Sequence, residues 1–187
     1  GKYSPHDYVA RVREAKAMGF PMTPSAIEML THIPGQMRTL YRVTPSWIIQ
    51  FIFDLASDND IRSIFDPWAS LGGLLVPLAT ALQPQSTIGL VQTTDEFEIT
   101  TAYLETDIDV EWFQANPIEW LSLSSNQFDM IVSILPLGMS RQTLNFVSSS
   151  GHSIEVSDQQ EHLILLSASK RLSEHGIAIF TISNKFF

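Results

Sequence analysis

The chain has 187 residues, of which 44% are hydrophobic and 17% are charged, and its formal net charge at pH 7 is −9. This length fits one domain, and this apolar content excludes full disorder. The absence of cysteine excludes disulfides, thiolate zinc sites and cysteine nucleophiles. No apolar run reaches the roughly 18 residues of a membrane-spanning helix, and no basic-then-apolar signal pattern opens the sequence. We therefore expect a globular, cytoplasmic protein with no membrane partner.

The charge is unevenly distributed along the chain. Residues 1–42 carry six Lys or Arg and three acids, whereas residues 43–187 carry five basic and seventeen acidic residues. Between Arg62 and Arg141 there are ten acids and no Lys or Arg. Binding to a phosphate backbone requires clustered cations. The sequence therefore predicts weak nucleic-acid binding by this chain alone, with the N-terminal segment as its only basic candidate surface.

Helix start signals precede three segments in the first part of the chain. They predict helices over residues 5–18, over residues 24–32 and in the segment that follows Thr44 and Pro45. The third helix has a broad apolar face, which we expect to be mostly buried. Residues 1–57 are therefore expected to form a helical N-terminal segment.

From residue 61 onward, short apolar runs alternate with helical segments. The runs predicted as strands are residues 61–65, 88–91, 110–114, 128–135 and 177–182. Helices are predicted from the end of the first loop to residue 82, over residues 95–105 and over residues 159–172, with a polar loop at residues 148–152. This alternation favours an α/β fold over residues 58–187, with a three-layer, mostly parallel sheet that binds ligands at the carboxyl ends of its strands.

One loop is a candidate ligand-binding segment. Residues 66–73 (DPWASLGG) follow the first predicted strand and lead into a helix. Glycines let the backbone approach a ligand closely, and a helix N-terminus offers unpaired N–H groups. Asp66, at the end of the strand, can accept a hydrogen bond from an amine or a hydroxyl. A Gly-Gly turn by itself also fits a plain strand-to-helix connection.

The context of this loop resembles the adenine-N6 DNA methyltransferases, in the arrangement found in modification subunits of type I restriction systems. The loop is similar to the family motif D-P-A-C-G-S-G-G-F-L, and Thr44 with Pro45 resembles an upstream T-P element that contacts the methyl donor. Residues 128–138 resemble the catalytic motif F-D-L-I-I-S-N-P-P-F-G. The resemblance covers about residues 44–187. It implies a Rossmann-like methyltransferase fold and S-adenosylmethionine as cofactor, contacted by Thr44, Asp66, Gly72, Gly73 and Asn116.

The donor-binding motifs depart from the family pattern. Ser70 replaces a glycine at the point where the backbone passes the donor. Val91 or Gln92 stands where the family has an acid that holds the ribose hydroxyls. Asn116 replaces an Asp that accepts a hydrogen bond from the adenine amine, and it is an uncharged acceptor. These departures predict impaired donor binding.

The catalytic motif departs further. Ile134 stands at the position of the family's Asn, whose side chain accepts a hydrogen bond from the target amine, and Leu137 stands at the position of the aromatic residue. Neither the acceptor nor the stacking platform for a flipped base is therefore present. No residue is assigned a catalytic role. The five histidines have no metal-ligand spacing, so no metal site is expected.

Three functional hypotheses follow from these observations. The first is a methyltransferase-like domain that has lost catalysis and acts as a scaffold or interaction domain. The second is an active S-adenosylmethionine-dependent methyltransferase on another substrate, and the third is a binding module for an adenosyl ligand. The family's sheet ends in an antiparallel hairpin that has no counterpart after Phe187. We therefore expect either a missing C-terminal region or another protein subunit over the sheet edge.

Overall fold

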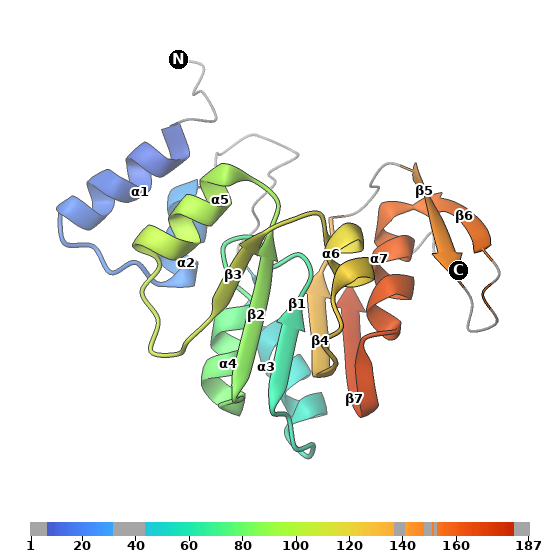
Figure 1. Ribbon diagram of the computed structural model, residues 1–187. Coiled ribbons are helices and arrows are strands. Elements are labelled where there is room, and N and C mark those ends of the chain that lie inside the picture. The colour runs from blue at the N-terminus through green and yellow to red at the C-terminus, as the bar shows by residue number, and fades with distance from the viewer. Residues whose placement is uncertain (1–6, 32–43, 137–140, 148–150, 152, 182–187) are drawn as a thin grey trace.

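The computed structural model describes residues 7–31, 44–136, 141–147, 151 and 153–181 (Figure 1). Its centre is a sheet of five strands in the order β3-β2-β1-β4-β7, and every neighbouring pair is parallel. The strands are β1 (Ser63–Asp66), β2 (Ser86–Val91), β3 (Glu111–Gln114), β4 (Phe128–Ile134) and β7 (Leu172–Thr181). The predicted α/β class and parallel sheet are confirmed, and β1 and β4 are direct neighbours.

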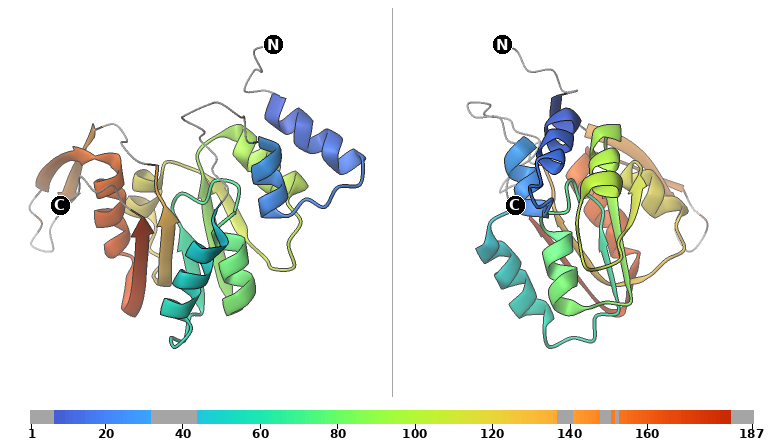
Figure 2. Two further views of the ribbon diagram at one scale, coloured as in Figure 1. Left: turned by 180° about the vertical axis from the view of Figure 1, so that it is seen from behind. Right: turned by 90° about the vertical axis from the view of Figure 1, so that its left-hand side faces the viewer.

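Helices cover both faces of this sheet, which gives the predicted three layers. Seen from behind, two helices lie in front of the strands (Figure 2): α3 (Ser46–Ala56) and α4 (Leu75–Leu82). The opposite face carries α6 (Pro117–Leu123) and α7 (Gln160–Ser169). Because both faces are covered, the strands β1, β2 and β4 are almost entirely buried.

The remaining helices gather beside the strand β3. They are α1 (Asp7–Ala17), α2 (Pro24–Thr31), α5 (Thr94–Glu98) and the π-helical turn η1 (Ile99–Tyr103). Val9, Val12 and Ala15 of α1 pack with Ile27 of α2 and Ile99 of η1 in a separate hydrophobic cluster. The helices predicted in the N-terminal part and over residues 95–105 are therefore present. Within the described part of the chain, no helix is long and apolar enough to cross a membrane.

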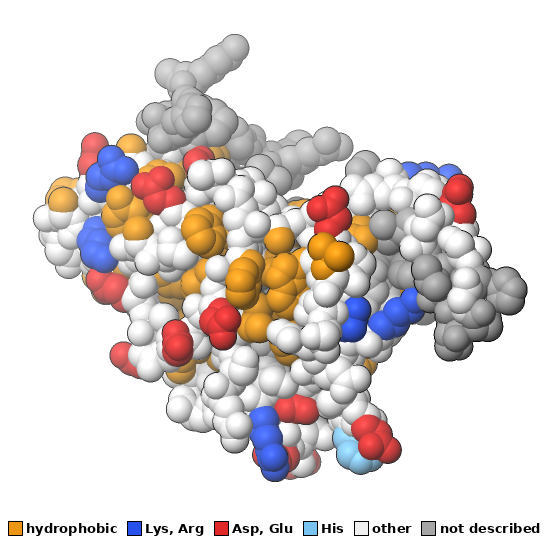
Figure 3. Space-filling view, in the orientation of Figure 1, with side chains coloured by type: hydrophobic (Ala, Val, Ile, Leu, Met, Phe, Trp, Pro, Cys, Tyr) orange, Lys and Arg blue, Asp and Glu red, His pale blue; other side chains and the backbone are white. Residues whose placement is uncertain are grey.

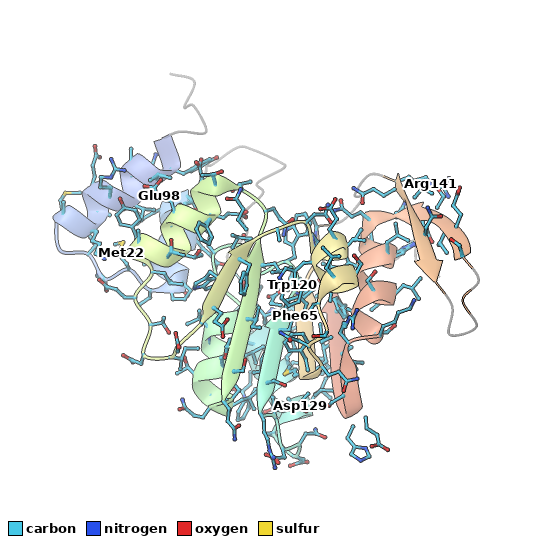
Figure 4. All side chains as sticks on the ribbon, viewed as in Figure 1. Met22, Phe65, Glu98, Trp120, Asp129 and Arg141 are labelled. Carbon is cyan, nitrogen blue, oxygen red and sulfur yellow. The ribbon has the colours of Figure 1, made fainter. Side chains whose placement is uncertain are left out.

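Aromatic residues fill the face of the sheet that α6 covers. Phe65 stacks on Trp120 with ring centroids 4.9 Å apart and on Phe128 at 4.7 Å. Figure 3 shows hydrophobic side chains gathered on this face, where Figure 4 labels Phe65 and Trp120. Phe113 of the edge strand β3 has its ring centroid 6.0 Å from that of Trp120 and remains 38% exposed.

Three features differ from the sequence-based expectation. The helix α6 was not predicted, and neither was an antiparallel pair formed by β5 (Arg141–Val147) and β6 (Ser153–Gln159), which packs beside α7. The apolar face of α3 packs on the core but is less buried than expected. Ile52 and Ala56 are buried, the partly buried Ile48, Ile49 and Phe53 pack against the same cluster, and Leu55 is exposed. Except for Gly151, the predicted polar loop at residues 148–152 lies outside the described residues.

Candidate functional site

The loop between β1 and α4 is held in place by the second strand. Ala69 donates its backbone N–H to the carbonyl oxygen of Leu90 at 2.9 Å. Ser70 has a left-handed backbone, with φ of 51°, at the position where the family has glycine. Its hydroxyl donates to Oε1 of Glu96 at 3.3 Å, so a polar contact accompanies this unfavourable conformation.

Asp66 lies at the carboxyl end of β1, and it is only 1% exposed. Its Oδ1 accepts hydrogen bonds from Oγ of Ser133 at 2.7 Å and from the backbone N–H of Trp68 at 2.9 Å. Burial raises the pKa of Asp66 to about 7, although both hydrogen bonds act in the opposite direction. Asp66 therefore joins β1 to β4 inside the protein, and its carboxyl group is not open to a ligand.

A carboxylate from outside the loop lies against its second glycine. Glu28 of α2 is 5% exposed, and its Oε2 accepts a hydrogen bond from the backbone N–H of Thr44 at 3.0 Å. Its Oε1 accepts from Oγ1 of Thr44 at 3.3 Å. A Cβ atom on Gly73 would overlap this carboxylate, so a side chain there would have to displace Glu28. Burial raises the pKa of Glu28, opposed by the two hydrogen bonds from Thr44.

The first glycine of the pair is covered by an aromatic ring. A Cβ atom on Gly72 would lie 3.2 Å from the ring of Trp112 and 3.5 Å from the side chain of Leu104. The same ring crosses Gly89, where a Cβ atom would lie 2.6 Å from it. Trp112 of β3, together with Val76 and Leu104, therefore lines the space beside Gly72, which has φ of 82°.

Asn116 uses its side chain to cap a helix. It is the N-cap residue of α6, and its Oδ1 accepts hydrogen bonds from the backbone N–H groups of Ile118 at 3.0 Å and Glu119 at 3.3 Å. These bonds engage the oxygen that was expected to accept from a ligand amine. Among the described contacts, Glu28 links Thr44 to Gly73, but none links Asn116 to either of them.

A buried carboxylate of α5, that of Glu96, lies against the turn after β2 and was not predicted from the sequence. Oε2 of Glu96 accepts hydrogen bonds from the backbone N–H groups of Gln92 and Thr93, both at 2.8 Å. Thr93 and Glu96 form the capping box of α5. The spacing Thr-x-x-Glu is the signal that could have identified this residue. The buried carboxylate of Glu96 therefore accepts hydrogen bonds from the backbone of the turn and from the hydroxyl of Ser70.

Two residues at positions of the catalytic motif, Ile134 and Leu135, pack in the hydrophobic core. Ile134 packs on the cluster between the sheet and the helices α3 and α4. Leu135 is 2% exposed and packs on the other side of the sheet with Leu163 and Ile164 of α7. Trp68 from the loop packs on this second cluster. Leu137 lies outside the described residues. In the described ranges, no group of three or more His, Asp or Glu side chains is placed to hold a metal ion.

No family model and no curated protein sequence matches this chain. Solved structures do. The methyltransferase subunit of a type I restriction-modification system from Streptococcus thermophilus superposes with a TM-score of 0.59 at 14% identity, over 87% of this chain and 39% of that chain. The fold is methyltransferase-like.

Two further solved structures have the same fold. Precorrin 8w decarboxylase from Methanobacterium thermoautotrophicum superposes with a TM-score of 0.54 at 16% identity, over 76% of this chain and 66% of that chain. A plantazolicin methyltransferase in complex with SAH superposes with a TM-score of 0.51 at 14% identity, over 72% of this chain and 44% of that chain. The chain thus spans less than two thirds of each of these proteins. At such identities the likeness establishes the fold alone.

Proposed function

We propose that this chain is a methyltransferase-like domain that has lost methyl transfer and acts as a scaffold or interaction domain. The observation that carries the proposal is the position of Glu28. Its carboxylate lies between Thr44 and Gly73, two residues that the family resemblance assigns to the methyl donor. In this arrangement, the residues expected to hold S-adenosylmethionine do not fit it.

The chemistry of the donor explains the misfit. S-adenosylmethionine carries a carboxylate on its amino-acid end, and a carboxylate accepts hydrogen bonds from N–H and O–H groups. Both donors of Thr44 are already directed at Glu28. A second carboxylate at this place would be close to the first, and two like charges in a buried site repel each other strongly. The side chain of Glu28 therefore competes with the donor for the same contacts.

The catalytic turn supports the same proposal. Adenine methylation needs a hydrogen-bond acceptor near the target amine and a platform for the flipped base. Ile134 offers no acceptor, and Leu135 next to it is part of the core between the sheet and α7. No step of methyl transfer can be assigned to these side chains.

A transfer assay tests the proposal. The protein is incubated with tritiated S-adenosylmethionine and unmethylated duplex DNA, and radioactivity retained on the DNA is counted. We expect no incorporation above a protein-free blank, while an active adenine methyltransferase assayed in parallel gives a clear signal. Incorporation by this chain would refute the loss of catalysis.

One observation favours a second candidate, a binding module for an adenosyl ligand. The side-chain amide nitrogen of Gln92 is buried, and it has no hydrogen-bond partner among the described residues. Gln92 stands at the end of β2, where the family resemblance puts the ribose. A buried donor without an acceptor is unfavourable, so a ligand oxygen there would stabilise it. Titration with adenosine, which lacks the carboxylate, distinguishes this candidate because Glu28 does not compete with it.

A further inference from the structure

The helix α3 exposes an apolar stripe on the side that faces away from the sheet. Trp47, Phe51 and Leu55 are 69%, 56% and 51% exposed, respectively. Their spacing of four residues puts them on one face of the helix. On the opposite side, Ile52 and Ala56 are buried against the sheet. A helix that is apolar on both sides is typically covered on both sides.

The surroundings of the stripe are open in the described part of the molecule. Seen from behind, α3 lies over the middle of the sheet, and no described helix lies over the back of β7 beyond it (Figure 2, left). Ile177 and Ile179 of β7 pack on the core cluster under α3 and are only partly buried. The apolar surface of α3 thus borders a part of the sheet that has no helical layer.

Acidic side chains accompany the stripe. Asp54 of α3 and Asp58 in the turn after it are both exposed, and Asp54 accepts a hydrogen bond from Gln50 at 2.7 Å. The nearest described cation along the chain, Arg62, is paired with Asp60. The exposed side of α3 therefore combines three large apolar side chains with uncompensated negative charge.

We propose that this surface docks an amphipathic α-helix of a partner protein, one that carries Lys or Arg beside an apolar stripe. From residue 47 to residue 55 a helix rises about 12 Å, which a partner helix of a few turns can cover. Aromatic side chains at the centre of an interface supply much of its binding energy, and opposite charges at the rim select the partner. The proposal rests on α3 and the turn that follows it, and it does not depend on the loss of methyl transfer.

Other occupants fit the surface less well. A second copy of this chain carries a net charge of −9 and would be repelled. The basic helix α1 of such a copy is not available to dock on α3, because its apolar residues Val12 and Ala15 are buried in that copy's core. Its basic residues Arg13 and Lys16 already contact Glu98 and η1. An anionic lipid surface would be repelled by Asp54 and Asp58.

A synthetic peptide tests the proposal by titration calorimetry. The probe is a helical peptide of about sixteen residues with Leu at every fourth position and Lys beside this stripe, long enough to form a helix on the surface. A matched peptide carries Glu in place of Lys. We expect saturable binding of the Lys peptide to the wild type and none of the Glu peptide. We also expect a blue shift of tryptophan emission, because Trp47 is highly exposed before binding.

Variants of α3 locate the binding. Trp47→Ala with Phe51→Ala, and separately Asp54→Asn with Asp58→Asn, should each weaken binding of the Lys peptide about tenfold or more. The matched controls are Leu123→Ala, an 87% exposed residue on α6, and Asp107→Asn with Asp109→Asn, which are exposed acids elsewhere. The controls should change binding less than about twofold. Circular dichroism melts verify that the variants fold, since all substituted side chains are exposed.

Three results would overturn the proposal. The first is equal binding of the Lys peptide to the wild type and to both α3 variants, which would place the contact elsewhere. The second is no binding to the wild type at millimolar peptide. The third is self-association of the wild type in analytical ultracentrifugation that the Trp47→Ala, Phe51→Ala variant abolishes, because a second copy would then be the occupant.

Discussion

The carboxylate of Glu28 lies so close to Gly73 that a side chain at this glycine would have to displace it. The same carboxylate accepts both hydrogen bonds that Thr44 can donate. Through this one side chain, α2 is connected to the loop after β1 and to the segment that begins α3. The loop that the family resemblance assigns to a methyl donor is therefore packed against another part of the protein.

The contact between Glu28 and Gly73 predicts a specific non-additivity. Gly73→Ala should lower the free energy of unfolding of the wild type by about 1–3 kcal/mol, because the new methyl group displaces a buried carboxylate. In the Glu28→Ala background the same substitution should cost less than about 0.5 kcal/mol or be slightly stabilising. Urea denaturation of the four proteins measures both effects.

Gly19→Ala is the matched control for this cycle. Gly19 has a left-handed backbone, with φ of 84°, and no atom within 4 Å of a built Cβ. Its substitution should cost about 1–2 kcal/mol from backbone strain in either background, so its effect adds to that of Glu28→Ala. Additive behaviour at Gly73 as well would contradict the contact.

Asp66 predicts how stability depends on pH. Its pKa is about 7 in the folded protein, mainly because of burial, against 3.8 ordinarily. The folded state therefore binds the proton more tightly than the unfolded state. The contribution of protonated Asp66 to the free energy of unfolding is fully present below about pH 4 and is lost as the pH rises to about 7. The free energy of unfolding should fall by at most about 1.4 kcal/mol per pH unit over this range. Asp66→Asn should remove this slope, whereas Asp107→Asn at an exposed site should leave it unchanged. Denaturation curves at several pH values between about 4 and 8 measure it.

The strands and the helix α3 could be predicted from the sequence because their signals are local. The apolar run at residues 128–135 and the helix start signal at Thr44 and Pro45 depend only on neighbouring residues. The helix α6 also had a local signal, since Asn116 and Pro117 are a typical N-cap and first-turn pair. Assigning Asn116 to a ligand concealed its capping role.

The side chains that pack against the loop after β1 could not be predicted from such local signals. Glu28 lies between Thr44 and Gly73, and no motif marks a glutamate on a short helix as buried. Such a contact depends on how α2 packs on the loop, which is a tertiary property. Trp112 over Gly72 is a second case, because a strand residue reveals its neighbours only when the strand order is known.

Rebuilding the catalytic turn should not restore methyl transfer. The triple substitution Ile134→Asn, Leu135→Pro and Leu137→Phe restores the family's residues, but Leu135 is fully buried against α7. Its loss should lower the free energy of unfolding by about 2–5 kcal/mol. The tritiated-donor assay on the triple variant should remain at the blank value. Leu135→Met, which conserves volume, should cost less than about 1.5 kcal/mol. Methyl transfer by the triple variant would mean that the donor site is open after all.

Binding to duplex DNA should be weak. Two exposed basic side chains of α1 make contacts within the protein, since Arg13 donates to Tyr103 and pairs with Glu98, and Lys16 contacts η1. We expect a Kd weaker than about 10⁻⁴ M at physiological salt, measured by fluorescence anisotropy of a labelled duplex. Micromolar binding that falls steeply with salt would show that a basic surface is available, and Arg13→Ala would then test whether it is on α1.

Direct titration of the wild-type protein with S-adenosylmethionine in a calorimeter tests the central claim, that the protein's own side chains fill the donor position. Because Glu28 already occupies the hydrogen-bond donors of Thr44 and the space at Gly73, we predict no saturable heat at ligand concentrations up to about 1 mM, which corresponds to less than about 4 kcal/mol of binding free energy. Saturable binding of one molecule per chain with a micromolar Kd would contradict the account.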